Sequence, residues 1–265
     1  MRHCSLIAMV LALLVAAPAP VRAQDGAEVL AAANALYREG QFAQAAGSYR
    51  EALSAGFDGP RVHYNLGNAL YRSGELGEAI AHYHAALAMA PRDRDIRANL
   101  DRALAERPAG RPAPAASGLH AVASRIVGGF TLSEFAAAAA LCWWGALAAS
   151  IALLIGAGRR RTVRRVAIAL GVLMLTSAGF AVARWWAYHA VERAVIAAET
   201  AQLRTGPGES FEVALSVEEG WMLRVLRTDA DWAEVLGEGG VAGWIPVSSL
   251  VMVQPRDGEI SAPDR

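Results

Sequence analysis

The chain has 265 residues, of which 54% are hydrophobic, and its 25 Lys and Arg side chains balance 25 Asp and Glu side chains. This length and apolar content predict more than one structural unit, and the zero net charge argues against a nucleic-acid partner. The only two cysteines, Cys4 and Cys142, exclude a disulfide framework. Each soluble unit is therefore expected to be held together by packing alone.

The N-terminus has the features of a secretory signal peptide. Arg2 and His3 precede the apolar segment Leu6–Ala17, which is too short to span a membrane comfortably. Val21-Arg22-Ala23 then supplies small residues around a cleavage site before Gln24. We therefore expect residues 1–23 to be a signal peptide; the alternative is an uncleaved N-terminal anchor.

Residues Gly26–Asp93 contain one pattern twice, with a period of 34. Such a period is typical of stacked helical hairpins. Gly40 and Gly74 are expected to end the first helix of each pair, and Ala45 and Ala79 to let its two helices approach closely. The repeats are assigned to residues 26–59 and 60–93. A capping helix, begun by Asp93 or Asp95, follows and extends to residue 107.

The second copy reads Tyr64-Asn65-Leu66-Gly67-Asn68-Ala69-Leu70-Tyr71, then Gly74-Glu75-Leu76-Gly77-Glu78-Ala79-Ile80. This phrase closely resembles the tetratricopeptide repeat. The resemblance implies an all-α domain whose concave face, made by the first helix of each pair, grips a peptide or a partner helix. The matching positions, which we expect to bind a partner, are Asn34, Tyr37, Arg38, Tyr64, Asn65, Asn68, Arg72 and Asn99. The alternative is an ordinary solvated helix surface.

Two long uncharged stretches, Phe135–Gly158 and Val166–Ala183, flank the cluster Arg159–Arg165. Each stretch is long enough to cross a bilayer as a helix, and the spans are assigned to residues 132–157 and 166–187. Five arginines in a short loop favour the cytoplasmic side, so the loop at residues 158–165 is expected there. Both flanking soluble regions would then share one compartment outside the cytoplasm, anchored by a two-pass hairpin.

The spans and their flanks carry little chemistry. Residues 108–131, rich in Pro and Ala at their start, are expected to be a linker with an interfacial segment. Trp143 and Trp144 are expected to pack against the second span, while Trp185 and Trp186 lie near its outer end. The spans contain no charged relay, so we expect them to act as an anchor.

Residues 191–254 change to short strands separated by Gly and Asp, with five or six strands expected in a small closed β-barrel. The order Leu203-Arg204-Thr205-Gly206-Pro207, then Asp231-Trp232, then Gly243-Trp244-Ile245 closely resembles a bacterial SH3-like domain. The resemblance implies a groove for peptides or cell-wall fragments; the alternative is a loop that only opens the barrel. The matching groove residues are Arg204, Pro207, Trp232 and Trp244, and both tryptophans are expected to serve partly as core. Residues 255–265 are expected to be a disordered tail.

The whole order describes a multidomain membrane protein: all-α helical hairpins, a two-helix transmembrane hairpin and a C-terminal all-β SH3-like barrel. This architecture resembles the BatE-type proteins of bacterial aerotolerance operons. The resemblance implies a scaffold beside von Willebrand factor A-type membrane proteins and a MoxR-type ATPase. An adaptor for protein partners is the first hypothesis, and a peptidoglycan-binding module that recruits a cell-wall enzyme is the alternative.

Catalysis is not expected from this sequence. An enzyme needs a nucleophile with its base, or a metal site, and Cys142 lies within a span. His82 and His84 are two residues apart on a helix and so point to different faces. We therefore expect no catalytic residues, no metal and no cofactor.

Overall fold

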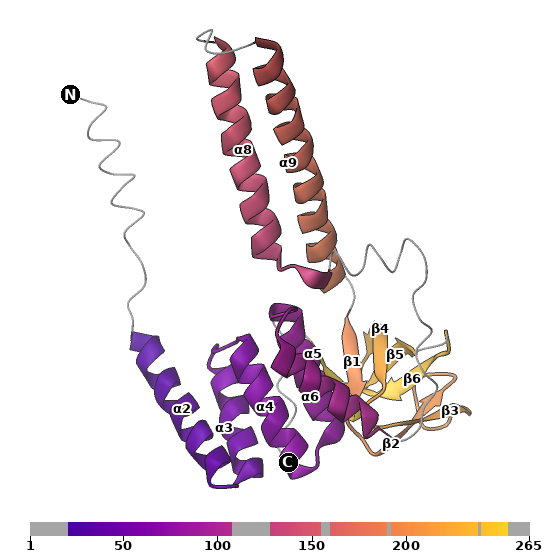
Figure 1. Ribbon diagram of the computed structural model, residues 1–265. Helices are drawn as coiled ribbons and strands as arrows, with labels where there is room; N and C mark the ends of the chain where they lie inside the picture. Colours follow the sequence, from indigo (N-terminus) through magenta and orange to yellow (C-terminus); the bar gives the residue numbers. More distant parts are fainter. Residues whose placement is uncertain (1–20, 108–127, 155–159, 190–191, 238–239, 254–265) are drawn as a thin grey trace, which may run out of the picture.

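The computed structural model describes residues 21–107, 128–154, 160–189, 192–237 and 240–253. A row of helices lies beside a small β-sheet, and two long helices extend from this assembly (Figure 1). Residues 1–20 of the expected signal peptide, residues 108–127 of the expected linker and the expected tail lie outside the described residues.

The N-terminal helices form two hairpins and a capping helix, as the repeat period predicts. They are α2 (Val21–Arg38), α3 (Phe42–Ser54), α4 (Pro60–Ser73), α5 (Leu76–Met89) and α6 (Arg94–Ala105). Gly40 and Gly74 both have positive φ, 80° and 92°, which ends the first helix of each pair at low cost. The carboxylate of Asp93 accepts from the backbone N–H groups of Asp95 and Ile96 and caps α6.

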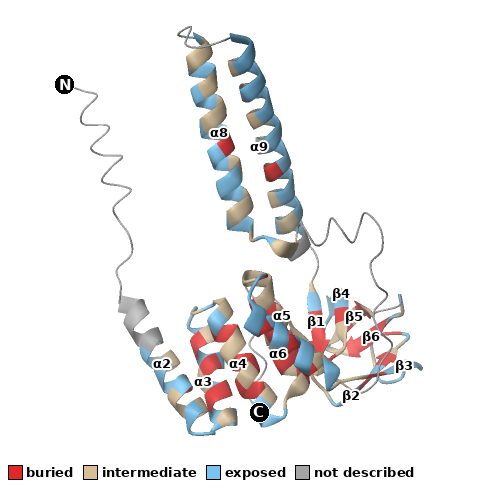
Figure 2. Cartoon of the chain, viewed as in Figure 1, coloured by how far each residue is buried: buried red, intermediate tan, exposed pale blue. Residues whose placement is uncertain are grey.

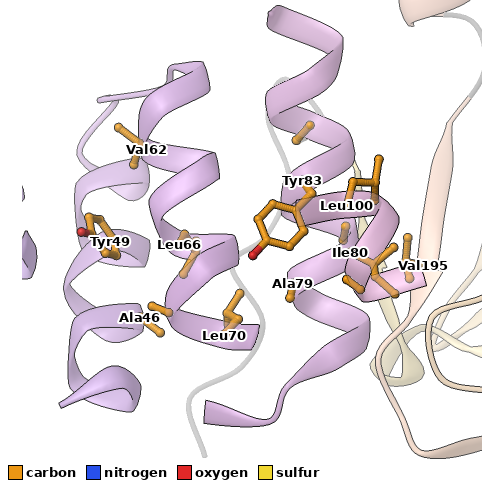
Figure 3. Packing of buried hydrophobic residues seen from close by; sticks show 14 of the residues in the cluster. Ala46, Tyr49, Val62, Leu66, Leu70, Ala79, Ile80, Tyr83, Leu100 and Val195 are labelled. Atoms are coloured by element: carbon orange, nitrogen blue, oxygen red, sulfur yellow. The ribbon is translucent and has the colours of Figure 1, made fainter. Parts of the chain in front are cut away.

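The hairpins pack through the alanines that the sequence singled out and through one tyrosine of each repeat. Ala45, Tyr49, Ala79 and Tyr83 are all buried. Figure 2 shows buried residues along α3, α4 and α5, and Figure 3 shows the side chains of Tyr49, Ala79 and Tyr83 between the helices. A Cβ atom at Gly67 would lie 2.8 Å from two atoms of the Tyr83 ring. Glycine is therefore needed at this position for α4 and α5 to approach.

The C-terminal unit is an antiparallel sheet of seven strands. They are β1 (Arg193–Ile196), β2 (Thr200–Arg204), β3 (Val213–Glu218), β4 (Met222–Asp229), β5 (Trp232–Leu236), β6 (Ala242–Pro246) and β7 (Leu250–Met252). Their order is β3-β2-β6-β5-β4-β1-β7. The described residues contain seven strands, where five or six were expected. Within the described residues β3 and β7 do not pair, so hydrogen bonds do not close the expected barrel.

The sheet is docked on helix α5 of the second hairpin. Val195 and Val253 are buried in the same apolar cluster as Ile80 (Figure 3). The N–H of Gly77 donates to the Glu219 carboxylate at 2.6 Å. A Cβ atom at Gly77 would overlap the carbonyl oxygen of Ile196. The sheet therefore adds Val195 and Val253 to the core of the repeats and keeps a second core of its own.

The remaining helices, α8 (Leu132–Leu154) and α9 (Arg160–His189), pair along their length. By length and composition, both could cross a membrane, with mean hydropathies of 1.9 and 2.2. Cys142 is buried between them, and the hydroxyl of Ser177 donates to the carbonyl oxygen of Phe135 at 2.9 Å. Since α9 begins at Arg160, most of the expected loop at 158–165 is helical.

Trp143 and Trp144 are placed differently from the expectation. They are 55% and 65% exposed, so most of each residue's surface is not covered by α9. The side of α8 that meets α9 carries small residues instead, and a Cβ atom at Gly145 would lie 3.0 Å from Leu170. Close helix approach needs such small side chains, which leaves the indole rings on the outer surface.

The helical repeats are tied to one end of this long hairpin. Arg184 of α9 donates to the carbonyl oxygen of Ala88 at 2.7 Å, and Arg92 pairs with Glu134 at the start of α8. Glu134 also accepts from the N–H of Thr131, while Thr131 Oγ1 accepts from the N–H of Glu134, a reciprocal helix cap. Both soluble units consequently lie at the end of the hairpin opposite the C-terminal end of α8 and the start of α9 (Figure 1).

Candidate interaction surfaces

The concave face of the repeats is formed by α2, α4 and α6, and its asparagines bond to neighbouring helices. In the first hairpin, the hydroxyl of Tyr49 donates to Asn34 Oδ1 at 2.6 Å. Asn65 of the next hairpin donates to the same oxygen at 3.2 Å. This pattern links three helices through one side-chain oxygen.

The same network recurs one repeat later. Tyr83 donates to Asn68 Oδ1 at 2.8 Å, and Asn99 Nδ2 donates to Asn68 Oδ1 at 2.8 Å and to the hydroxyl of Tyr64 at 3.1 Å. Burial raises the pKa of Tyr49 and of Tyr83, which keeps both hydroxyls protonated as donors. The expected partner-binding asparagines therefore also fix the stacking of the repeats.

A cavity of about 130 Å³ opens on this face, between α2, α4, α5 and α6. It brings together four of the expected residues, Tyr37, Asn68, Arg72 and Asn99, with three that sequence reasoning missed, Tyr71, Tyr83 and Arg102. The period itself carried the signal for two of them, because Tyr71 and Arg102 stand exactly one repeat after Tyr37 and Asn68. Asn34, Arg38, Tyr64 and Asn65 lie outside the cavity lining.

The cavity is cationic and aromatic. The guanidinium of Arg72 lies 4.4 Å from the centre of the Phe42 ring, which holds it in place through a cation–π contact. Arg102 supplies the second positive charge, and no carboxylate lines the cavity. The Glu106 carboxylate accepts from the hydroxyl of Tyr71, one of the lining residues. Among the described residues no carboxylate pairs with Arg72 or Arg102, so the two guanidinium groups favour an anionic group such as a carboxylate.

On the SH3-like unit, Arg204 is bound to its own loop. Its guanidinium donates to the carbonyl oxygens of Glu209 and Phe211 at 2.7 and 2.8 Å, and to Gln202 Oε1 at 2.8 Å. Arg204 therefore shapes the loop that carries the exposed Pro207. This placement accords with the alternative in which the loop opens the barrel.

The two tryptophans differ in how far they are covered. Trp232 and Trp244 alternate with Ala233 and Ile245, which point into the apolar core of the sheet. Trp244 is buried, as expected of a residue that serves partly as core, although it lies outside that interior cluster. Arg227 lies 4.9 Å from its ring centre and bonds to Glu234 at 2.6 Å. Trp232 remains partly exposed and lies outside the cluster as well.

A histidine pair lies between α4 and α5, and sequence reasoning missed it. Nδ1 of His63 is 2.9 Å from Nδ1 of His82, and Nε2 of His63 is 2.9 Å from the carboxylate of Asp58. Burial lowers the pKa of His63, and burial together with His63 lowers the pKa of His82 to about 3. Both rings are therefore neutral near pH 7. Among the described residues no group of three or more His, Cys, Asp or Glu side chains could hold a metal ion.

Comparison with known families identifies both soluble units. The tetratricopeptide repeat family matches residues 30–94, and the bacterial SH3 domain family matches residues 197–251. No curated protein sequence matches the chain. The chain thus combines a helical repeat region with a bacterial SH3 domain and carries two apolar helices between them.

Proposed function

We propose that this chain is a non-catalytic adaptor, anchored in the bacterial inner membrane, that presents both soluble units to the periplasm. Two features support this arrangement. The arginines at the start of α9 favour the cytoplasmic side, and the repeats and the sheet lie at the opposite end of the hairpin. Tetratricopeptide repeats support protein–protein interaction as the activity of the helical unit.

The concave cavity carries the proposal, because its chemistry selects a class of partner. Arg72 and Arg102 present two positive charges beside Asn and Tyr donors. A carboxylate from an acidic partner segment would bind the two guanidinium groups through charge-assisted hydrogen bonds. The volume of about 130 Å³ suits one side chain rather than a whole peptide. We infer that an Asp or Glu side chain anchors the partner here.

Crosslinking in intact membranes followed by mass spectrometry tests this function. Arg72→Glu should lower partner capture at least tenfold, because a charge-assisted bond is lost and a like charge is introduced. Arg61→Glu makes the same charge change on the exposed surface of the same helix, outside the cavity, and should retain the partners. Equal capture by the two variants would remove the cavity from the proposal.

The resemblance to BatE-type proteins narrows the expected partners. We propose that the acidic segment belongs to a von Willebrand factor A-type membrane protein working with a MoxR-type ATPase in a stress-related complex. The same crosslinking experiment identifies the captured chain directly. Partners from unrelated systems would leave the adaptor role standing and overturn this assignment.

The bacterial SH3 domain favours a second candidate function, cell-wall binding. Trp232 is the accessible ring of the expected groove, since Arg204 and Trp244 are engaged within the domain. Co-sedimentation with purified peptidoglycan, lost on Trp232→Ala with the domain still folded, would support this candidate. Absence of sedimentation by the wild-type chain would exclude it.

A further inference from the structure

Positive charge is concentrated where the sheet, helix α5 and the end of α9 meet. In the pairing of β1 with β4, Arg193 lies directly opposite Arg224, and both residues are exposed. Like charges at opposite positions of a sheet repel each other. Arg184, near the end of α9, bonds to α5 at Ala88. Partial burial, together with the charges of Arg224 and Arg184, lowers the pKa of Arg193.

The two strand arginines lie on the face of the sheet that is docked on the repeats. Two residues along the strands, Val195 pairs with Met222, and both pack in the core that contains Ile80 of α5. Side chains two residues apart on a strand share a face, so Arg193 and Arg224 project from the same face. They lie beyond this apolar contact, toward the long hairpin, because β1 begins shortly after α9 ends (Figure 1).

In the described part of the chain neither of these two guanidinium groups pairs with a carboxylate. Glu192 is adjacent in sequence, and its carbonyl oxygen accepts from the N–H of Val225. Val225 packs in the sheet's own core, on the opposite face. Since successive residues of a strand alternate between faces, the side chain of Glu192 leaves the strand on the face away from Arg193 and Arg224.

The surroundings of this pair select an anion at a defined depth. Burial, followed by the positive charges of Arg193 and Arg107, lowers the pKa of the neighbouring His84 to about 4, so arginines alone set the charge here. Guanidinium groups bind phosphate through pairs of parallel N–H donors. Trp185 and Trp186, at the end of α9, are typical of the level of the lipid headgroups. A phospholipid places its phosphate at this level.

We propose that Arg193 and Arg224 bind the phosphate group of a phospholipid from the leaflet next to the soluble units. The phosphate would replace the repulsion between the two arginines with attraction to both. Because the arginines belong to the sheet, the lipid would hold the SH3-like unit at the bilayer surface, in addition to its contact with α5. This inference rests on the proposed membrane location and adds a ligand that the adaptor role does not require.

Native mass spectrometry of the full chain in a neutral detergent tests the site, with phosphatidylglycerol as the probe. Diacylglycerol with the same acyl chains lacks the phosphate and should not bind. Arg193→Gln and Arg224→Gln should each weaken phosphatidylglycerol binding roughly tenfold, as expected for the loss of a charge-assisted hydrogen bond. Arg94→Gln removes the same charge at the exposed start of α6 and should bind the lipid as the wild type does.

Equal binding by all three variants, or binding of diacylglycerol, would overturn the site. Inorganic phosphate at the lipid's concentration should not displace the lipid, whose acyl chains add apolar contact; displacement would assign the arginines to free phosphate and overturn the lipid as ligand. Circular dichroism checks the fold without lipid. Removing one of two like charges should not lower the unfolding midpoint, and a lower midpoint in both strand variants would make these arginines structural and overturn the site as well.

A membrane extraction separates this inference from the proposed function. Absence of phosphatidylglycerol binding, with the chain retained in alkali-extracted membranes, overturns the lipid site and leaves the anchored adaptor intact. Loss of the chain from those membranes would instead overturn the membrane location, and both proposals with it.

Discussion

The two helical hairpins share their inner faces and differ on their outer faces. At equivalent positions of the two repeats, Ala45 and Ala79 are both buried, and Tyr49 and Tyr83 make the same bond to an asparagine. The exposed Ala43 of the first hairpin corresponds to Gly77, which is buried beneath the sheet. Repetition is thus retained where helix meets helix. It is lost where one hairpin has acquired a second domain as its neighbour.

The largest effect is expected from a change at the shared inner face. Ala79→Arg would bury an unpaired charge between α4 and α5 and should cost about 4 kcal/mol of unfolding free energy. Ala43→Arg, on the exposed side of the first hairpin, is the control and should change stability by less than about 0.5 kcal/mol. Thermal unfolding of the full chain in detergent, followed by circular dichroism, measures both. Similar midpoints for the two variants would contradict the hairpin packing.

The second hairpin should also be the acid-sensitive one. His82 corresponds to Ser48 in the first hairpin, and its pKa of about 3 lies below the ordinary value of 6.5. Between pH 6.5 and pH 3, His82 is therefore protonated in the unfolded chain and neutral in the folded chain. The contribution of neutral His82 to the free energy of unfolding is fully present above pH 6.5. It falls by about 1.4 kcal/mol per pH unit as the pH drops toward 3.

At pH 4.5 the loss from His82 alone is about 3 kcal/mol by the same relation. His82→Gln keeps a neutral donor for His63 but cannot titrate, so its unfolding midpoint should depend less on pH. Unfolding of the full chain from pH 7.5 to pH 4.5 gives the comparison. Parallel curves for the variant and the wild type would remove His82 as the cause.

The smallest change in stability is expected on the outer faces of the two hairpins, at the equivalent positions 43 and 77. Gly77→Ala should push the Ile196 carbonyl away and cost about 2 kcal/mol, less the gain in helix propensity. The reverse change at the equivalent position, Ala43→Gly, should cost only about 1 kcal/mol. Hydrogen exchange of the β1 amides distinguishes them, because only the first change should loosen the sheet. Equal protection of β1 in both variants would argue against docking through Gly77.

The elements that depend on local periodicity could be predicted from the sequence. The repeat period predicted the four hairpin helices and the glycine stops at Gly40 and Gly74. The cap of the next helix was limited to Asp93 or Asp95, and Asp93 is the one that caps it. The lengths of the two apolar stretches gave α8 and α9. These features follow from residues close in sequence, for which turn, cap and pattern rules apply.

What escaped prediction depends on contacts between distant segments. In the sequence, Gly77 is an ordinary residue of the repeat pattern. The structure shows that it contacts Ile196, which is distant in sequence. His63 and His82 carry no shared spacing signal, and Asn68 was expected to serve a partner, whereas it also joins Tyr83 to Asn99. Trp143 and Trp144 were predicted to pack against α9, whereas both are largely exposed. Hydropathy does not determine how a helix is rotated about its own axis.

The bonds from Arg184 to Ala88 and from Arg92 to Glu134 fix the distance between the helical repeats and the end of the long hairpin. Helix α6 starts beside this junction at Arg94 and runs away from the long hairpin, so Arg102 stands about 12 Å farther out. A partner anchored in the same bilayer would need roughly four extended residues beyond the lipid headgroups for its acidic side chain to reach Arg102. The proposed adaptor would therefore select a partner by the length of the segment between its membrane anchor and its acidic side chain, as well as by its charge.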